Sequence, residues 1–130
     1  MEKSLLKEIQ TAAQAIHDKK GKQIMILDVA GVCSMTECFI IAEGNVDRHV
    51  KALANEVVDR LGEKHNQTPS VVEGKNLGQW VVLDYGNYVI HLLTPELRQH
   101  YNIENVWKEG KILYLKLDDH PLSGEGFYDA

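Results

Sequence analysis

Two periods of hydrophobic residues alternate along the chain, one typical of helices and one typical of strands. Leu5, Ile9, Ala12 and Ile16 recur every three or four residues, and Gly21 follows at a place suited to a helix end. The first predicted element is therefore an amphipathic helix.

Two apolar runs, residues 24–29 and 38–42, are short and rich in β-branched side chains, which predicts strands buried on both faces. A second helix is predicted after Gly44, with Asn45 as its N-cap and Asp47 in its first turn. Its apolar stripe consists of Val46, Val50, Leu53, Ala54, Val57, Val58 and Leu61. A strand at 71–73 follows, so strand, helix and strand predict a right-handed crossover.

Residues 80–85 and 88–93 predict a β-hairpin, because the two-residue loop Gly86-Asn87 suits a type II′ or I′ turn. This loop pairs Tyr85 with Tyr88 and sorts the side chains onto two faces. One face is almost purely apolar and is predicted to be core: Val81, Leu83, Tyr85, Tyr88, Ile90 and Leu92. The other, the hairpin face, carries Trp80, Val82, Asp84, Val89, His91 and Leu93. Since a dry core tolerates polar groups only when they are paired, the hairpin face is the predicted working surface.

A short helix is predicted to begin at Thr94-Pro95-Glu96 and to run through Tyr101. Residues 112–117 alternate enough to predict one more strand or an extended arm. Residues 118–130 are polar and contain glycine, so they are predicted to be mobile.

The chain has 14 Lys and Arg against 19 Asp and Glu, a formal charge of −5, and a pI near 5.6. This balance disfavours a primary role on naked nucleic acid, whose phosphates bind clustered Lys and Arg. A basic protein is the more natural electrostatic partner, although a mild negative charge also simply aids solubility.

Neither a membrane span nor a signal peptide is evident, so the protein is expected to stay in the cytoplasm. Cys33 and Cys38 are the only cysteines, and they lack the C-x-x-C spacing of redox or zinc sites. Both are expected to be reduced, small hydrophobic side chains.

The segments TECFII (36–41) and GNVDRHV (44–50) precede EG (73–74) and WVVLDYGN (80–87), and His91 follows. This combination resembles the ribosomal silencing factor family, RsfS, also called the Iojap family. The resemblance covers roughly residues 4 to 108 and ends near Trp107, beyond which residues 111–130 extend without an assigned role.

The resemblance implies a compact α/β fold with a mixed sheet, related to nucleotidyltransferases, often dimeric and without known catalytic activity. It implies binding to the large ribosomal subunit through its ribosomal protein number fourteen. Such binding blocks joining of the small subunit and damps translation when nutrients run short. Mitochondrial and chloroplast relatives exist, but no transit peptide is evident here, so a bacterial cytoplasmic member is expected.

The fold class is thus predicted to be α/β (α+β). A single domain is expected, with a mixed β-sheet of about five strands, helices packed on it and a nucleotidyltransferase-like topology. Residues 1–110 should form the RsfS-like domain, and residues 111–130 a C-terminal extension that is partly extended or mobile.

Trp80 is the predicted anchor of a partner interface, because an aromatic residue among aliphatic ones is the commonest kind of hot spot. Burial of Trp80 under the tail is the alternative. Val82 and Leu93 would surround Trp80 as apolar contacts. Asp84 would either meet a Lys or Arg of a basic ribosomal protein or merely cap the hairpin turn.

His91 lies across from Val82 on the hairpin face and completes the predicted site there; a metal would need further ligands, so none is predicted. Glu96, Arg98 and Tyr101 either extend the docking surface or form a solvated helix face. The turn before Arg48 and His49 is a weak candidate for an anion site, and both residues are expected to be structural or secondary contacts.

Two alternative functions stay open, a nucleotidyltransferase-like enzyme and an assembly factor of the large subunit that uses the same surface. The enzyme would need Mg²⁺ between clustered carboxylates and a Gly-Ser loop for phosphates. Asp28 stands in Asp-Val-Ala and Asp84 precedes Tyr-Gly, so neither forms a D-x-D pair. No catalytic residue, cofactor or hydrolase motif is predicted.

Overall fold

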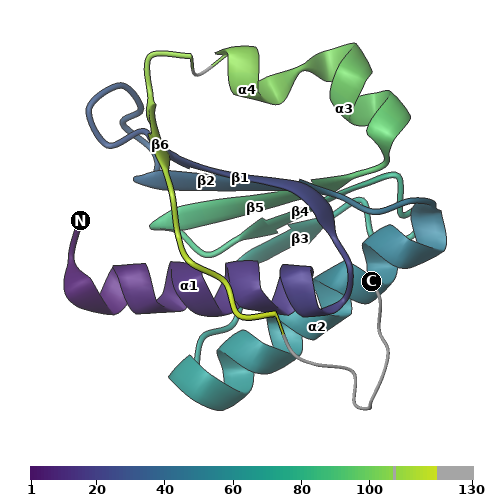
Figure 1. Ribbon diagram of the computed structural model, residues 1–130, viewed down its shortest axis with the longest axis horizontal. Coiled ribbons are helices and arrows are strands. Elements are labelled where there is room, and N and C mark those ends of the chain that lie inside the picture. Colours follow the sequence, from purple (N-terminus) through teal and green to yellow (C-terminus); the bar gives the residue numbers. More distant parts are fainter. Residues whose placement is uncertain (107, 120–130) are drawn as a thin grey trace.

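The computed structural model describes residues 1–106 and 108–119, which form a single mixed α/β domain (Figure 1). The elements are, in order, α1 (Lys3–Asp18), β1 (Lys22–Asp28), β2 (Cys38–Glu43), α2 (Asp47–His65), β3 (Val71–Glu73), β4 (Trp80–Asp84), β5 (Tyr88–Leu93), α3 (Pro95–Tyr101), α4 (Ile103–Val106) and β6 (Lys111–Leu113). The predicted fold class is confirmed. The sheet has six strands where about five were expected, because Lys111–Leu113 pairs with β1.

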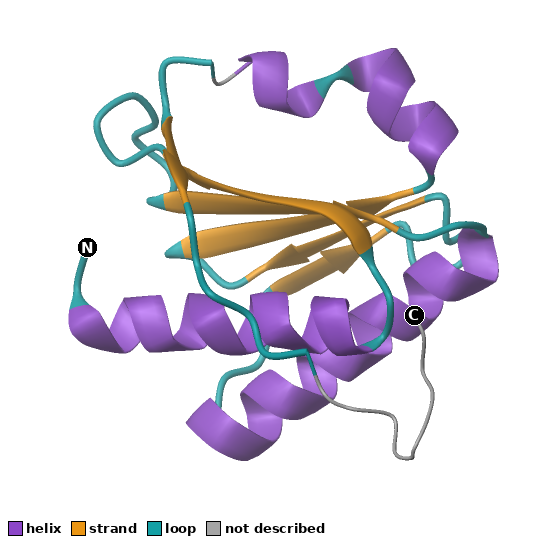
Figure 2. Cartoon of the chain, in the orientation of Figure 1, coloured by secondary structure: helices purple, strands orange, loops and turns teal. Residues whose placement is uncertain are grey.

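Helices cover both faces of the sheet, α1 and α2 one face and α3 and α4 the other (Figure 2). The larger core lies under α1 and α2, where the predicted helical stripes meet the apolar face of the hairpin. Val46 was wrongly placed in the second stripe, since it precedes the helix and is 54% exposed. The smaller core lies under α3 and α4 and is built around Leu27, Val29, Phe39, Ile41, Leu93 and Ile103. Because α3 and α4 are short, they leave part of the sheet face beside them uncovered.

The strands are ordered β3-β4-β5-β2-β1-β6, and the central pair, β5 and β2, is parallel. The hairpin register predicted from the turn is confirmed, with Trp80 opposite Leu93 and Val82 opposite His91. Gly86 has a φ of +86°, as the first central residue of a type II′ turn requires. The register therefore fixes which side chains share the hairpin face.

The start of α2 differs from the prediction, because Val46 and not Asn45 is the N-cap and no side chain caps the helix. The backbone N–H of Asn45 instead donates to Nδ1 of His49 at 2.9 Å. The ring of His49 also lies 2.7 Å from the carbonyl oxygen of Lys19. His49 thus ties the turn before α2 to the end of α1, the structural role expected for it.

The segment after α4 begins with β6 and then follows α1 as far as Asp119 (Figure 1). The alternatives of a strand and an extended arm for residues 112–117 are therefore both partly realised. Of residues 118–130, which were predicted to be mobile, Asp118 and Asp119 are described and hydrogen-bond to α1. Residues 120–130 and Trp107 lie outside the part of the chain that the structure describes.

Candidate protein-docking site

The hairpin face lies on the side of the sheet that carries α3 and α4, and it is only partly covered. Its side chains are half-buried apart from Leu93, which is fully buried. The opposite face of the same hairpin is core, as predicted, with five of its six side chains buried and Tyr85 partly so. The hairpin face is thus a mixed, partly exposed surface, but Leu93 is part of the small core beneath α3 and is not exposed on it.

Trp80 and His91 form a hydrogen bond with each other on this face. The indole N–H of Trp80 donates to Nδ1 of His91 at 3.1 Å, and the ring of Phe39 lies 5.5 Å from the imidazole, centroid to centroid. Burial lowers the pKa of His91 to about 4, so the imidazole is neutral near pH 7 and able to accept this hydrogen bond. The polar groups are therefore paired within the protein, and the Trp80 ring is left to offer apolar surface.

Tyr101 of α3 lies against Trp80 with ring centroids 4.9 Å apart and an angle of 47° between the rings. Tyr101 is 53% exposed, whereas Trp80 is half-buried. The two rings form an aromatic ledge where the hairpin meets α3. Among the described residues, Trp80 packs against Tyr101 of α3. Leu113, Leu115 and Leu117 of the C-terminal segment pack against the larger core instead, so residues 108–119 do not bury Trp80.

Arg98 is buried, with 7% of its surface exposed, so it is neither a docking contact nor part of a solvated helix face. Its guanidinium lies 3.1 Å from the carboxylate of Glu104 and 3.4 Å from that of Glu43, and it also donates to the carbonyl oxygen of Gln23. Sequence patterns missed this role because the three partners lie far apart in the chain. Arg98 joins α3, α4, β1 and β2.

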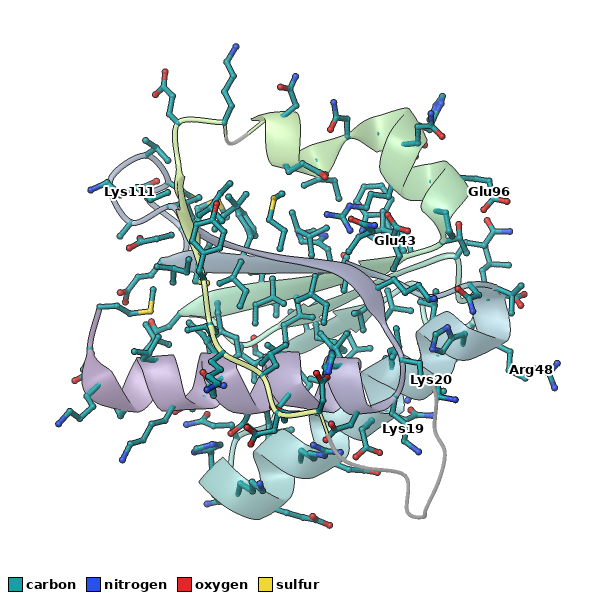
Figure 3. The ribbon with its side chains drawn as sticks, viewed as in Figure 1. Lys19, Lys20, Glu43, Arg48, Glu96 and Lys111 are labelled. Carbon is teal, nitrogen blue, oxygen red and sulfur yellow. The ribbon has the colours of Figure 1, made fainter. Side chains whose placement is uncertain are left out.

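Asp84 caps the hairpin turn, since its carboxylate accepts a hydrogen bond from the backbone N–H of Gly86 at 2.8 Å. The capping alternative for Asp84 is thus confirmed, and the half-buried carboxylate still borders the hairpin face. Val82 is half-buried on that face, and Glu96 is exposed on α3. Glu96 and Arg48 point away from the sheet, while Glu43 points into the domain toward α3 (Figure 3).

A hollow of about 300 Å³ adjoins the face between the start of α2 and the start of α3. It is lined by Asn45, Val46, Asp47, Gln79, Thr94, Glu96 and Leu97. The carboxylates of Asp47 and Glu96 at this hollow suit a cationic group better than the anion considered for the turn before Arg48. Extending the predicted hairpin register by one pair would have placed Gln79 beside Thr94, whose N–H donates to the Gln79 carbonyl oxygen at 3.0 Å.

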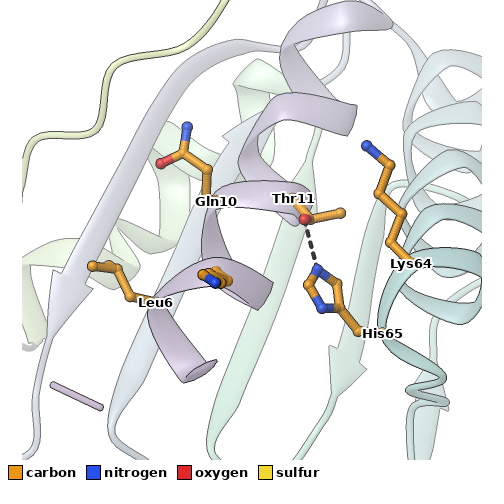
Figure 4. A pocket seen from close by; sticks show the side chains of 6 residues that line it. Leu6, Gln10, Thr11, Lys64 and His65 are labelled. Carbon is orange, nitrogen blue, oxygen red and sulfur yellow. Dashed lines mark hydrogen bonds between the residues drawn. The ribbon is translucent and has the colours of Figure 1, made fainter. Parts of the chain in front are cut away.

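A wider groove of about 620 Å³ lies on the opposite side of the molecule, between α1 and the end of α2 (Figure 4). His65 and Thr11 share a hydrogen bond of 2.8 Å there, and Lys64 lies beside them. Across residues 1–106 and 108–119, no three His, Cys, Asp or Glu side chains gather to hold a metal ion. No helix in that same part of the chain is both long and apolar enough to cross a membrane.

Comparisons with known proteins agree on one family. Residues 2–125 match the model of the RsfS family, described as ribosomal silencing factor during starvation. The match includes most of residues 111–130, the segment predicted to be a C-terminal extension. The ribosomal silencing factor RsfS of Bacillus subtilis is 34% identical over 111 residues, which cover 85% of this chain and 91% of that protein.

Relatives of known structure and from organelles extend the comparison. A crystal structure of a protein from Chromobacterium violaceum has a TM-score of 0.77 and 37% identity, covering 83% of this chain and 88% of the other. The mouse protein called mitochondrial assembly of ribosomal large subunit protein 1 is 29% identical over 102 residues, 77% of this chain but 45% of that protein.

Proposed function

Because this chain belongs to the RsfS family of ribosomal silencing factors, we propose that it binds the large ribosomal subunit through ribosomal protein number fourteen. The bound domain occupies space that the small subunit needs, so the two subunits do not join. Translation is repressed by steric occlusion, and no bond is made or broken. The protein acts in the cytoplasm.

The observation that carries this proposal is the aromatic ledge of Trp80 and Tyr101 beside an acidic hollow. The Trp80 indole N–H is already bonded to His91, so the ring is held in place before a partner arrives. A rigid, partly exposed aromatic pair is a common hot spot of protein interfaces. Asp47 and Glu96 at the adjoining hollow complement the positive charge expected of a ribosomal protein.

Co-sedimentation of the purified protein with isolated large and small subunits tests the proposal. The wild type is expected to pellet with the large subunit alone, and Trp80→Ala to bind at least about thirtyfold more weakly, as for a hot spot worth about 2 kcal/mol. Tyr114→Ala is the matched control, because it removes an aromatic ring that is 87% exposed and lies outside the hairpin face. Circular dichroism establishes that both variants are folded.

Equal binding of wild type and folded Trp80→Ala would remove the ledge from the proposal. Binding to neither subunit would overturn the ribosomal role altogether. Val82, Asp84 and Glu96 are proposed as peripheral contacts, and alanine variants at these positions should weaken binding less than Trp80→Ala does.

A role in assembly of the large subunit is the second candidate, favoured by the name of the mouse relative. Both roles begin with the same docking event, so binding alone does not separate them. The two roles are separated by measuring the formation of complete ribosomes from purified, mature subunits. Silencing predicts that the wild-type protein inhibits this joining and that Trp80→Ala does not; an assembly factor without silencing activity leaves the joining of mature subunits unchanged.

The nucleotidyltransferase alternative requires Mg²⁺-dependent nucleotide binding, which occlusion does not. We propose that the protein is not an enzyme, and nucleotide binding that depends on Mg²⁺ would contradict this. A homodimer is also proposed. Sedimentation of wild type and Trp80→Ala over a range of concentrations then shows whether the dimer uses the ledge and competes with the ribosome.

A further inference from the structure

Residues 111–119, the C-terminal strap, close one edge of the sheet and run on along α1. Lys111, Ile112 and Leu113 pair with β1, which would otherwise be the edge strand. Side chains alternate along the strap: Leu113, Leu115 and Leu117 pack against the larger core, whereas Tyr114, between Leu113 and Leu115, is 87% exposed. The strap is therefore held along its whole described length.

Helix α1 binds the backbone of the strap through two glutamines. Nε2 of Gln10 donates to the carbonyl oxygen of Lys116 at 2.7 Å. The amide of Gln14 makes two bonds to Asp118, donating to its carbonyl oxygen at 2.9 Å and accepting from its N–H at 2.8 Å. An amide side chain that both donates to and accepts from one residue fixes the path of an extended segment as a neighbouring strand does.

The strap is joined to α3 and α4 by a short connection, because α4 ends at Val106 and β6 begins at Lys111. Helices α3 and α4 rest on few anchoring side chains, chiefly Arg98, Ile103 and the partly buried Leu97. They are also held at both ends, by β5 before α3 and by β6 after α4. If the strap detached, the helices would lose their hold at the end of α4 and keep only β5, Arg98 and their apolar contacts, and chain ends held in this way fray readily.

We propose that Gln10 and Gln14 are positioning residues for the hairpin face, although both lie on α1, on the opposite side of the sheet. Through the strap they keep α3 and α4 seated, and α3 keeps Tyr101 against Trp80. The expected effect of the two glutamines on ribosome binding rests on the proposed function. Their expected effect on the seating of α3 and α4 does not.

The test compares Leu115→Asn with Tyr114→Asn, which place the same polar group on opposite sides of the strap. A double variant, Gln10→Ala with Gln14→Ala, removes the amide bonds without touching the strap. Hydrogen exchange followed by mass spectrometry measures protection of residues 95–106 and of 111–119, and co-sedimentation measures affinity for the large subunit. Leu115→Met is the conservative variant that should restore both readouts.

Leu115→Asn and the glutamine double variant are expected to speed exchange in residues 95–106 and to weaken subunit binding by roughly twofold to thirtyfold, the range of coupling through packed elements. Tyr114→Asn should change neither readout. Faster exchange in 111–119 with unchanged exchange in 95–106 would overturn the inference. If Trp80→Ala binds the ribosome normally, the proposed function fails, while the exchange measurement still decides whether the strap seats the helices.

Discussion

Replacing Arg98 by alanine tests whether the buried guanidinium holds α3 and α4 on the sheet. The substitution removes the partner of two carboxylates, those of Glu43 and Glu104, and of the carbonyl oxygen of Gln23. All three acceptors stay in place after the substitution. Two carboxylates would then share a partly buried site without a cation between them.

The magnitude follows from the exposure of these groups. Removal of one partner of a fully buried ion pair costs about 3–5 kcal/mol. The side chains of Glu43 and Glu104 retain 19% and 24% exposure, so water solvates part of the uncompensated charge. We therefore expect a loss of about 2–3 kcal/mol of unfolding free energy and a fall in Tm of about 10 °C.

Urea unfolding followed by circular dichroism measures the loss. Arg48→Ala is the matched control, because Arg48 is exposed and points away from the domain (Figure 3). Combining Arg98→Met with Glu104→Gln should recover part of the stability, since it removes one uncompensated charge. A loss below about 0.5 kcal/mol for Arg98→Ala, typical of a surface residue, would refute the role assigned to the cluster.

Two further predictions concern His91, on the hairpin face, and Gly74, which follows β3. Burial lowers the folded-state pKa of His91 to about 4, whereas the unfolded-state pKa is about 6.5. As pH falls, the unfolded state therefore binds a proton first, and the free energy of unfolding decreases between about pH 6.5 and pH 4. Urea unfolding should show about 2 kcal/mol more loss from pH 7.5 to 4.5 in the wild type than in His91→Asn, which keeps an acceptor for Trp80; equal losses would contradict the lowered pKa. Gly74 has a φ of +79°, and an added Cβ would lie 1.9 Å from the carbonyl oxygen of Trp80. Gly74→Ala should therefore lower the free energy of unfolding by about 2–4 kcal/mol in the same measurement. Gly31→Ala should cost far less, because nothing lies within 4 Å of a Cβ added there. Similar losses for the two variants would exclude a steric cause.

Local patterns predicted most of the fold because their signals lie within a few residues of one another. The turn at Gly86-Asn87 was enough to fix the pairing of Trp80 with Leu93 and of Val82 with His91. The same reasoning separated the core face of the hairpin from the mixed face. It predicted that polar groups on the mixed face need partners, and Trp80 and His91 do pair with each other.

Features that depend on distant contacts could not be predicted in this way. Arg98 was expected at the surface because short helices usually expose their charges, yet its partners at positions 23, 43 and 104 come from three other segments. Leu93 lies on the mixed face by register but is buried, since α3 and α4 fold back over that end of the sheet. The contact of Tyr101 with Trp80 likewise requires the path of the chain after the hairpin.

The bonds between α1 and the C-terminal strap also bear on how the chain folds during synthesis. Gln10 and Gln14 bind residues that are translated 106 and 104 positions later. Contacts at such separation form late, because the intervening chain must first be ordered. On a translating ribosome, one side of α1 and the β1 edge therefore stay uncovered until the last part of the domain has emerged. For most of its synthesis, a nascent chain of this protein therefore has a β1 edge that β6 does not yet cover, and uncovered edges of this kind pair readily with strands of neighbouring chains.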